Sequence, residues 1–360
     1  MLIYTSLAII ILAFIILSFL NTAVFGAKPN QKGLENESNF KNGIFHNLSQ
    51  TQVMSKEGSF FKVLGEWLNK SKENEPKDII PVIESDLKNL PNNPIVTWFG
   101  HSSYLLCADE KTVLVDPVFH RASPIPLFGK PFPTSFDYDI QHFPTIDYLV
   151  ITHDHYDHLD YQFIKKIIPQ VKQFVVSAGV EAHLLLWGAK ENQITALNWH
   201  QNKTFEDFNF TALPARHFSG RKFKRGETLW SSFALKTKSL SIYLGGDSGY
   251  DHHFKEIGNT YGPFDLSILE CGQYGKYWPN IHMTPEETYL AAKELNSKKL
   301  FPVHWAKFSL STHSWKDPIN LLVQTQKQDE NPLEIITPQI GEVYNFTLEN
   351  YSKNWWEQIK

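Results

Sequence analysis

The first segment of the chain is an unbroken apolar run. Residues 2–20, LIYTSLAIIILAFIILSFL, contain no charged side chain, and about twenty helical residues are enough to cross a bilayer core of roughly 30 Å. The run therefore predicts a single-pass membrane anchor at the N-terminus. A cleaved signal peptide is the alternative. Signal peptides usually carry a Lys or Arg before the apolar run, and none precedes this one. Lys28 and Lys32 follow it and slightly favour the cytoplasmic side for the rest of the chain.

A polar arm follows this run. Residues 30–56 are rich in Asn, Ser and Gln, a composition typical of a linker or an extended arm. The stretch SFFKVLGEWLNK, residues 59–70, has apolar positions at helical spacing and predicts one short helix. We therefore divide the chain into an anchor at 1–27, an arm with a short helix at 28–93, and a main domain at 94–360.

From residue 94 onward, short apolar runs alternate with helical patterns. IVTWFG, SYLLCA and TVLVDP, within residues 95–117, read as consecutive strands. Further strands are predicted at 146–152, 173–177, 207–215, 232–237, 240–249, 266–272 and 299–305, and helices at 159–168, 180–188, 284–296 and 318–328. The alternation predicts an α/β (α+β) domain in which helices cover packed sheets.

The composition is that of a well-packed globular protein. Of 360 residues, 42% are hydrophobic and 20% are charged. A formal net charge of -4 gives no electrostatic reason to expect nucleic acid as a partner, because proteins that bind it usually carry a basic surplus. Cys107 and Cys271 lie far apart in apolar runs, so we expect buried thiols rather than a disulfide or metal ligands.

The stretch THDHYDHLD, residues 152–160, crowds histidines and aspartates directly after a predicted strand. Alternate side chains of an extended segment point the same way, so His153, His155 and Asp157 can converge, and His158 stands at the turn into the next helix. Imidazole and carboxylate together suit zinc and similar divalent ions, and a catalytic site keeps an open coordination position. The motif predicts a metal site, but alone it does not complete one.

Three more candidate ligands follow predicted strands further along the chain. They are His217 in LPARHFSGR, Asp247 in YLGGDSGY and His304 in LFPVHW. Taken singly, each is more often a hydrogen-bonded histidine or a turn aspartate. Combined with H-x-H-x-D-H, they give the number of ligands that a two-metal hydrolytic centre needs.

The motif and its later partners resemble those of the metallo-β-lactamase superfamily, from about Pro94 to about His313. The resemblance implies a four-layer αβ/βα sandwich with two metals at one edge of the facing sheets. The ligands that it implies are His153, His155 and His217 for one metal, Asp157, His158 and His304 for the other, and Asp247 as the bridge between them.

Within that superfamily, the chain more closely resembles the N-acyl-phosphatidylethanolamine-hydrolysing phospholipase D family. The segments that carry this likeness are FGAKP, VTWFGHSSYLL, VLVDPVF, ARHFSGR, GGDSGY, NIHMTPEE and PVHWAKFSLS. The resemblance implies a membrane phospholipid substrate, hydrolysed to an N-acylethanolamine and phosphatidic acid. The alternatives are a lactonase or phosphoesterase acting on a soluble substrate, and a non-catalytic metal-binding membrane protein. A membrane is an expected partner, and a homodimer is left open.

The chemistry that these residues suggest is phosphodiester hydrolysis at paired cations. The cations would lower the pKa of a water from about 15.7 toward about 7, and the hydroxide would attack phosphorus. Asp247 and Asp157 would serve catalysis as ligands. Zinc suits this donor set best, although iron or manganese could take the same ligands.

Six further residues are candidates for supporting or substrate-binding roles. Asp116 and His101 are expected to orient ligating histidines through their second ring nitrogen, although Asp116 before a proline could equally close a turn. His282 resembles a family position near the substrate phosphate, but Thr284 could be a helix cap there and leave His282 merely adjacent. Apolar loops are expected to select the substrate, and the predicted contact residues are His282, Phe119, Tyr274 and Trp278.

Overall fold

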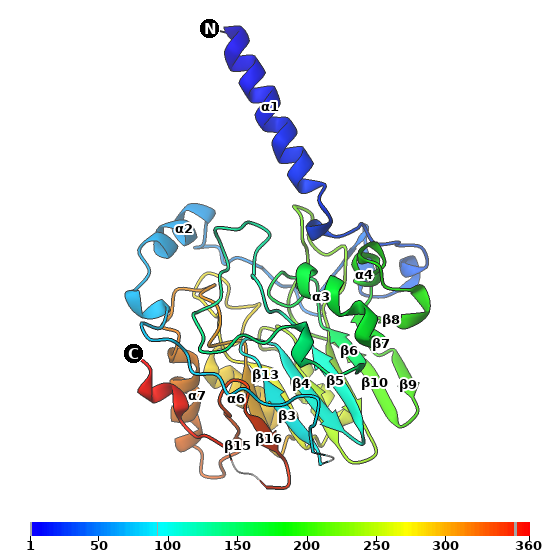
Figure 1. Ribbon diagram of the computed structural model, residues 1–360, viewed down its shortest axis with the longest axis vertical. Helices are drawn as coiled ribbons and strands as arrows, with labels where there is room; N and C mark the ends of the chain where they lie inside the picture. Colours follow the sequence, from blue (N-terminus) through cyan, green and yellow to red (C-terminus); the bar gives the residue numbers. More distant parts are fainter. Residues whose placement is uncertain (1, 92, 349–350) are drawn as a thin grey trace.

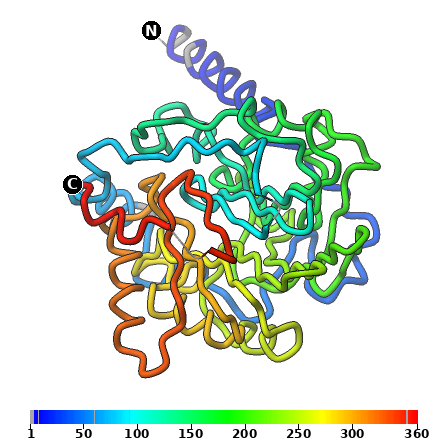
Figure 2. The backbone as a smooth tube through the Cα atoms, turned by 60° about the horizontal axis from the view of Figure 1, so that its bottom comes forward, coloured from blue at the N-terminus to red at the C-terminus, as the bar shows by residue number. Residues whose placement is uncertain are grey.

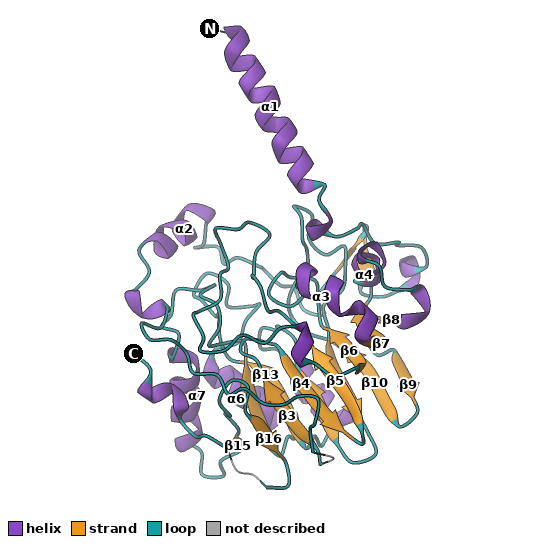
Figure 3. Ribbon diagram, viewed as in Figure 1, coloured by secondary structure: helices purple, strands orange, loops and turns teal. Residues whose placement is uncertain are grey.

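Two seven-stranded sheets form the body of the protein (Figure 1, Figure 3), in a computed structural model that describes residues 2–91, 93–348 and 351–360. The first sheet has the order β16-β3-β4-β5-β6-β7-β8 and the second has the order β15-β14-β13-β12-β11-β10-β9. The strands of the first sheet are β3 (Ile95–Trp98), β4 (Tyr104–Ala108), β5 (Lys111–Val115), β6 (Ile146–Ile151), β7 (Val171–Ser177), β8 (Ile194–Leu197) and β16 (Val343–Asn345). Those of the second are β9 (Asn202–Phe205), β10 (Phe208–Leu213), β11 (Ser232–Lys236), β12 (Ser241–Leu244), β13 (Leu266–Glu270), β14 (Lys299–Val303) and β15 (Glu334–Ile335).

Each sheet has an antiparallel half and a parallel half. In the first sheet β3, β4 and β5 are antiparallel neighbours, and β5 to β8 are parallel. In the second sheet β9 to β12 are antiparallel, and β12 to β15 are parallel. Strands two steps apart in an antiparallel run point the same way. As a result, β3, β5 and β6 end at one edge of the first sheet, and β10, β12, β13 and β14 end at one edge of the second.

The buried side chains alternate between two cores. In β5, Val113 and Val115 belong to the large core shared with the second sheet, whereas Leu114 faces the other way, into a core shared with helix residues such as Phe163. This alternation follows from the period of two in an extended chain. The helices are α1 (Leu2–Leu20), α2 (Phe60–Leu68), α3 (Tyr161–Ile167), α4 (Glu181–Trp187), α5 (His253–Tyr261), α6 (Pro285–Glu294) and α7 (Asp317–Lys327).

Helices cover the outer faces of both sheets. Helices α3 and α4 share the second core with β4 to β7, and α5, α6 and α7 contribute Phe254, Ala291 and Ile319 to the cluster that contains the second sheet. The result is a mixed α/β sandwich with two large sheets, as the strand and helix patterns predict. Its layers hold the ends of the strands in fixed positions.

Helix α1 projects away from the body (Figure 1). Several of its apolar side chains are exposed, among them Ile9 at 67% and Phe14 at 70%. Among the helices whose residues are described, none meets the length and apolarity required to span a bilayer. The predicted transmembrane anchor is therefore not supported.

The polar arm runs along the body rather than away from it. In Figure 2 its blue trace lies beside the green part of the chain. The hairpin of β1 (Phe40–Lys41) and β2 (Ile44–Phe45) buries Phe40 and Phe45 in a cluster with Trp199 and Trp230. Helix α2 lies within the stretch for which the spacing predicts a helix.

His253, the first residue of α5, is a buried histidine, and its protonation in acid should destabilise the folded protein. Its side chain is 3% exposed. Burial lowers its pKa to about 3, with Asp251 opposing the shift and Arg216 adding to it. The pKa in the unfolded chain is about 6.5, so between these values only the unfolded chain binds the proton. Stability is therefore lost as the pH falls below about 6.5.

Replacing His253 with Gln should remove this part of the acid sensitivity. The difference in free energy of unfolding between the wild type and His253→Gln is expected to fall by about 1 kcal/mol per pH unit below about pH 6.5. Denaturant titrations of both proteins with a chelator present would measure it, because loss of metal in acid then affects neither. Parallel pH curves for the two proteins would contradict the assignment.

Candidate metal centre

The candidate ligands gather where strands of the two sheets end. The loop after β6 carries the motif at residues 152–160, and loops after β3 and β5 carry His101 and Asp116. In the second sheet, loops after β10, β12 and β14 carry His217, Asp247 and His304. These strand ends lie at one edge of each sheet, so residues separated by up to about two hundred positions become neighbours.

The first group of side chains consists of His153, His155, His217 and Asp247. One ligand atom from each lies within 4.8 Å of all the others. Nδ1 of His155 is 3.0 Å from Nε2 of His153 and 3.2 Å from Nε2 of His217. Oδ2 of Asp247 is 3.7 Å from each of those two Nε2 atoms. Three nitrogens and one carboxylate oxygen that converge in this way could hold a metal ion.

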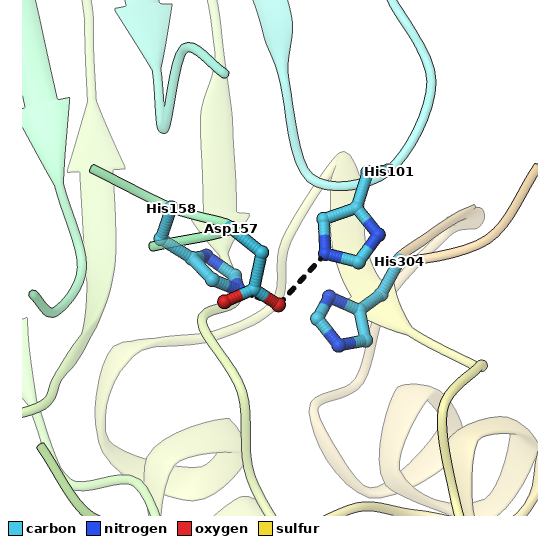
Figure 4. Close-up of side chains that lie close together, drawn as sticks. All are labelled: His101, Asp157, His158 and His304. Carbon is cyan, nitrogen blue, oxygen red and sulfur yellow. Dashed lines mark hydrogen bonds and ion pairs between the residues drawn. The ribbon is translucent and has the colours of Figure 1, made fainter. Parts of the chain in front are cut away.

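The second group consists of His101, Asp157, His158 and His304, again within 4.8 Å of one another (Figure 4). Oδ2 of Asp157 lies 3.0 Å from Nε2 of His101 and 3.8 Å from Nε2 of His158. Oδ1 of Asp247 lies 3.2 Å from Nε2 of His158 and 3.2 Å from Nδ1 of His304. The two oxygens of Asp247 therefore face different groups.

Two buried atoms in this centre suit a cation. Nε2 of His158 and Oδ1 of Asp247 are buried without a hydrogen-bond partner, although buried polar groups are nearly always paired. A divalent ion between them would satisfy both atoms, and the donor set of imidazoles and carboxylates is the one that such ions take. The residues present therefore fit a metal.

Hydrogen bonds on the far side of the rings fix which nitrogen carries the proton. Nδ1 of His217 lies 2.8 Å from the carbonyl oxygen of Ile281 and must donate to it, so neutral His217 presents an unprotonated Nε2 to the first group. Nδ1 of His158 donates in the same way to Asp116 at 2.8 Å. An unprotonated inward nitrogen is the state that binds metal.

Asp116 serves both groups. Besides His158, its carboxylate accepts from the backbone N–H of Thr152 at 2.9 Å and from the Thr152 hydroxyl at 2.6 Å. Because that hydroxyl donates to Asp116, it accepts from Nδ1 of His153 at 3.0 Å. Asp116 is 1% exposed and lies behind the histidines rather than among the candidate ligands.

Most of the candidate ligands have the charge state that a metal needs. Burial lowers the pKa values of His153, His217 and His304 well below the usual histidine range. Burial raises the pKa of Asp247, but His158 and His304 outweigh it and hold the pKa well below its usual range. These three imidazoles are therefore neutral beside an ionised carboxylate at neutral pH. His158 differs: burial lowers its pKa, but Asp247 and Asp157 outweigh burial and hold the pKa well above the usual histidine range. A cation that binds at His158 therefore has to displace a proton.

Backbone conformation marks three of these positions. His101, Asp116 and His304 have φ angles of 52°, 40° and 70°. Residues with a Cβ rarely adopt this left-handed region, and it costs of order 1 kcal/mol or more each. All three residues lie in loops that follow a strand, where this conformation turns the chain sharply.

Sequence reasoning missed Glu270, the last residue of β13. Together with Asp247, His282 and His304 it forms a third group within 4.8 Å. Oε2 of Glu270 lies 2.5 Å from Nδ1 of His282. The signal in the sequence was a carboxylate at the end of the apolar strand LSILE. Burying an unpaired carboxylate costs much free energy, so a glutamate at this position indicates a partner or a function.

His282 lies at the open side of the centre, as do Asp157 and His155. The side chains of His282 and Asp157 are 12% and 14% exposed, whereas His153, His158 and His304 are buried. Thr284 also makes the predicted capping box with Glu287. The cap and the proximity of His282 to the centre therefore occur together.

The other predicted substrate residues lie apart from the ligand groups. Phe119 packs in an aromatic cluster with Phe99 and Phe163, at ring distances of 5.5 and 4.5 Å. Tyr274 stacks on His313 at 4.6 Å, and the indole of Trp278 donates to the carbonyl of Gln273. Their substrate contacts stay predictions.

Comparisons with known proteins agree with this geometry. A family model described as a beta-lactamase superfamily domain matches residues 111–305. An uncharacterized protein of Mycobacterium tuberculosis is 34% identical over 329 residues, which cover 89% of this chain and 88% of the relative. The N-acyl-phosphatidylethanolamine-hydrolyzing phospholipase D 1 of Caenorhabditis elegans is 29% identical over 301 residues, covering 76% and 84% of the two chains. In fold, the chain is similar to a metallo hydrolase from Ignicoccus hospitalis, with a TM-score of 0.54, 22% identity, and coverage of 71% of this chain and 98% of that one.

Proposed function

Because this chain belongs to the metallo-β-lactamase superfamily of metal-dependent hydrolases, we propose that it is a two-metal phosphodiesterase of the phospholipase D type. Its proposed substrate is N-acyl-phosphatidylethanolamine, and its products are an N-acylethanolamine and phosphatidic acid. The observation that carries the proposal is the position of Asp247, whose two oxygens face two different groups of histidines. The likeness to the Caenorhabditis elegans enzyme supports the choice of substrate.

The two groups of ligands each suit one cation. His153, His155 and His217 would hold the first, Asp157, His158 and His304 would hold the second, and Asp247 would be shared. We assign both cations as zinc, because the donors are histidines and carboxylates without thiolate. When bound, two such cations lower the pKa of a water and neutralise charge on phosphoryl oxygens.

The residues of the chain then have separate tasks. Asp116 and Thr152 bond Nδ1 of His158 and of His153, so that Nε2 of each ring would be the nitrogen that takes the cation. Burial lowers the pKa of His282, but Glu270 outweighs burial and raises the pKa to about 9, so the ring carries both protons. Nδ1 then donates to Glu270, and the N–H at Nε2 would donate a hydrogen bond to a phosphoryl oxygen at the open side. His101 holds Asp157 by a hydrogen bond at 3.0 Å.

A lipid hydrolysis assay in ¹⁸O-labelled water tests the proposal. Protein of measured metal content is incubated with N-acyl-phosphatidylethanolamine in mixed micelles, and the products are identified by mass spectrometry. Attack of water on phosphorus breaks the bond to the ethanolamine oxygen, so one ¹⁸O is expected in the phosphatidic acid and none in the N-acylethanolamine. Phosphorylated sugar lactones serve as the competing substrates. Hydrolysis of lactones with no lipid product would overturn the substrate assignment.

A further inference from the structure

The arm that precedes the main domain is bound to the segment that carries His217. The backbone N–H of Phe45 donates to the carbonyl of Gly226 at 2.8 Å. Further along the arm, the Thr51 hydroxyl accepts from Nε of Arg216 at 3.1 Å. The arm therefore contacts residues that come before His217 in the sequence and residues that come after it.

Asn47 of the arm contacts His217 itself. Its Oδ1 accepts from the backbone N–H of His217 at 3.0 Å, and its Nδ2 donates to the carbonyl of His217 at 2.8 Å. The same Oδ1 accepts from the indole of Trp230 at 2.9 Å. The side-chain amide thus pairs with both backbone groups of one residue, as a neighbouring strand would.

The other side of the loop is tied to the loop of Asp247. The backbone N–H of Arg216 donates to the Ser248 hydroxyl at 2.9 Å, and the N–H of Gly249 donates to the carbonyl of Arg216 at 2.9 Å. His217 is held between these bonds and Asn47, while its ring is held by Ile281. Without Asn47, one of the two supports of its backbone is lost.

The contact between the arm and the loop also forms part of the wall of an open pocket beside the candidate centre. The pocket has a volume of about 330 Å³. The residues around it include Asn47, Ser49 and Thr51 of the arm, and His217, Phe218 and Arg225 of the facing loop. The arm is therefore part of the wall next to a candidate ligand and not only a connection.

We propose that Asn47 is a positioning residue of the metal centre, which fixes the backbone of His217 so that its imidazole faces His155 and Asp247. This rests on the metal role proposed for His217. A partner of a ligand typically changes metal affinity by ~10–100-fold when it is removed, and Asn47 acts on the ligand through its main chain.

Asn39 provides a matched control on the same arm. It exchanges two side-chain hydrogen bonds with Asn198, at 2.8 and 3.0 Å, and is half-buried like Asn47. Asn39→Ala should therefore loosen the arm as Asn47→Ala does. It removes no contact with His217.

The experiment measures zinc affinity by competition with a chelator, the absorption spectrum of the cobalt-loaded protein, and thermal unfolding without metal. Asn47→Ala is expected to lower the affinity for one of the two zinc ions by ~10–100-fold and to alter the absorption spectrum of the cobalt-loaded protein. Asn39→Ala should keep the wild-type affinity and spectrum, although both variants lower the unfolding temperature of the metal-free protein. Asn47→Asp keeps the acceptor but loses the donor, so an intermediate loss is expected. It also serves if Asn47→Ala does not fold.

Two outcomes separate this proposal from the proposed function. Wild-type affinity and spectrum in the Asn47 variants would overturn the positioning role, even if the protein hydrolyses the lipid. Selective loss of one zinc in those variants would support it, even if the lipid proves not to be the substrate.

Discussion

Replacing Asp247 with Asn is expected to abolish hydrolysis, lowering kcat by on the order of 1000-fold. An amide has nearly the same volume as the carboxylate, so the fold should persist. It offers one oxygen instead of two and carries no charge, whereas Asp247 faces His153 and His217 with Oδ2 and His158 and His304 with Oδ1. Removing a charged group that both cations would share weakens both sites and the stabilisation of the transition state.

Metal content and turnover together check this prediction. Bound zinc is expected to fall from two equivalents to one or fewer, in parallel with the loss of activity on the lipid. Asp265→Asn is a suitable control. Asp265 accepts hydrogen bonds from Ser241 and Lys298, and it lies before β13, at the end of that strand away from the candidate centre. Two retained equivalents of zinc with unchanged turnover would show that Asp247 does not bridge.

The sheet edge explains why the candidate centre was visible in the sequence. His217, Asp247 and His304 each follow a strand, and strands that run the same way end together at one edge. The structure brings these three to the residues of THDHYDHLD within 4.8 Å. Strand periodicity and chemically distinctive side chains were enough to predict this convergence, and the two-sheet α/β sandwich fits the fold that the resemblance implied.

Asn47 and Phe119 show what the sequence could not reveal. The partner of Asn47 lies 170 residues away, and an Asn in a polar arm has no local signal that distinguishes it from a loop residue. Phe119 lies in a proline-rich loop, where an aromatic ring can face a substrate or a core equally well. It faces Phe99 and Phe163. Only the packing of distant segments decides between these outcomes.

Short strands were missed for a related reason. β8 at Ile194–Leu197 and β16 at Val343–Asn345 are short and only partly buried, whereas all four residues of the equally short β3 are buried. Their pairing with β7 and β3 makes them strands. Here tertiary contacts outweigh local pattern.

Asp116→Asn is expected to lower the affinity for the metal ion on the His158 side by ~10–100-fold, while the fold persists. The carboxylate accepts three hydrogen bonds, two from Thr152 and one from Nδ1 of His158. An amide cannot accept at both of its ends. If its NH₂ faces His158, Nδ1 of His158 must accept, and the proton moves to Nε2, the atom that faces Asp247. If its oxygen faces His158, the NH₂ meets the donating N–H of Thr152.

Asp147→Asn separates orientation of the ligand from simple loss of stability. Asp147 also accepts from the N–H and hydroxyl of one threonine, Thr112, and from the basic side chain of Lys172, but at the opposite end of the same sheet. Both variants should lower the free energy of unfolding of the metal-free protein by about 1–3 kcal/mol. Zinc competition titrations should find weakened binding in Asp116→Asn alone. Equal zinc affinities in the two variants would mean that Asp116 supports the fold without selecting the protonation state of His158.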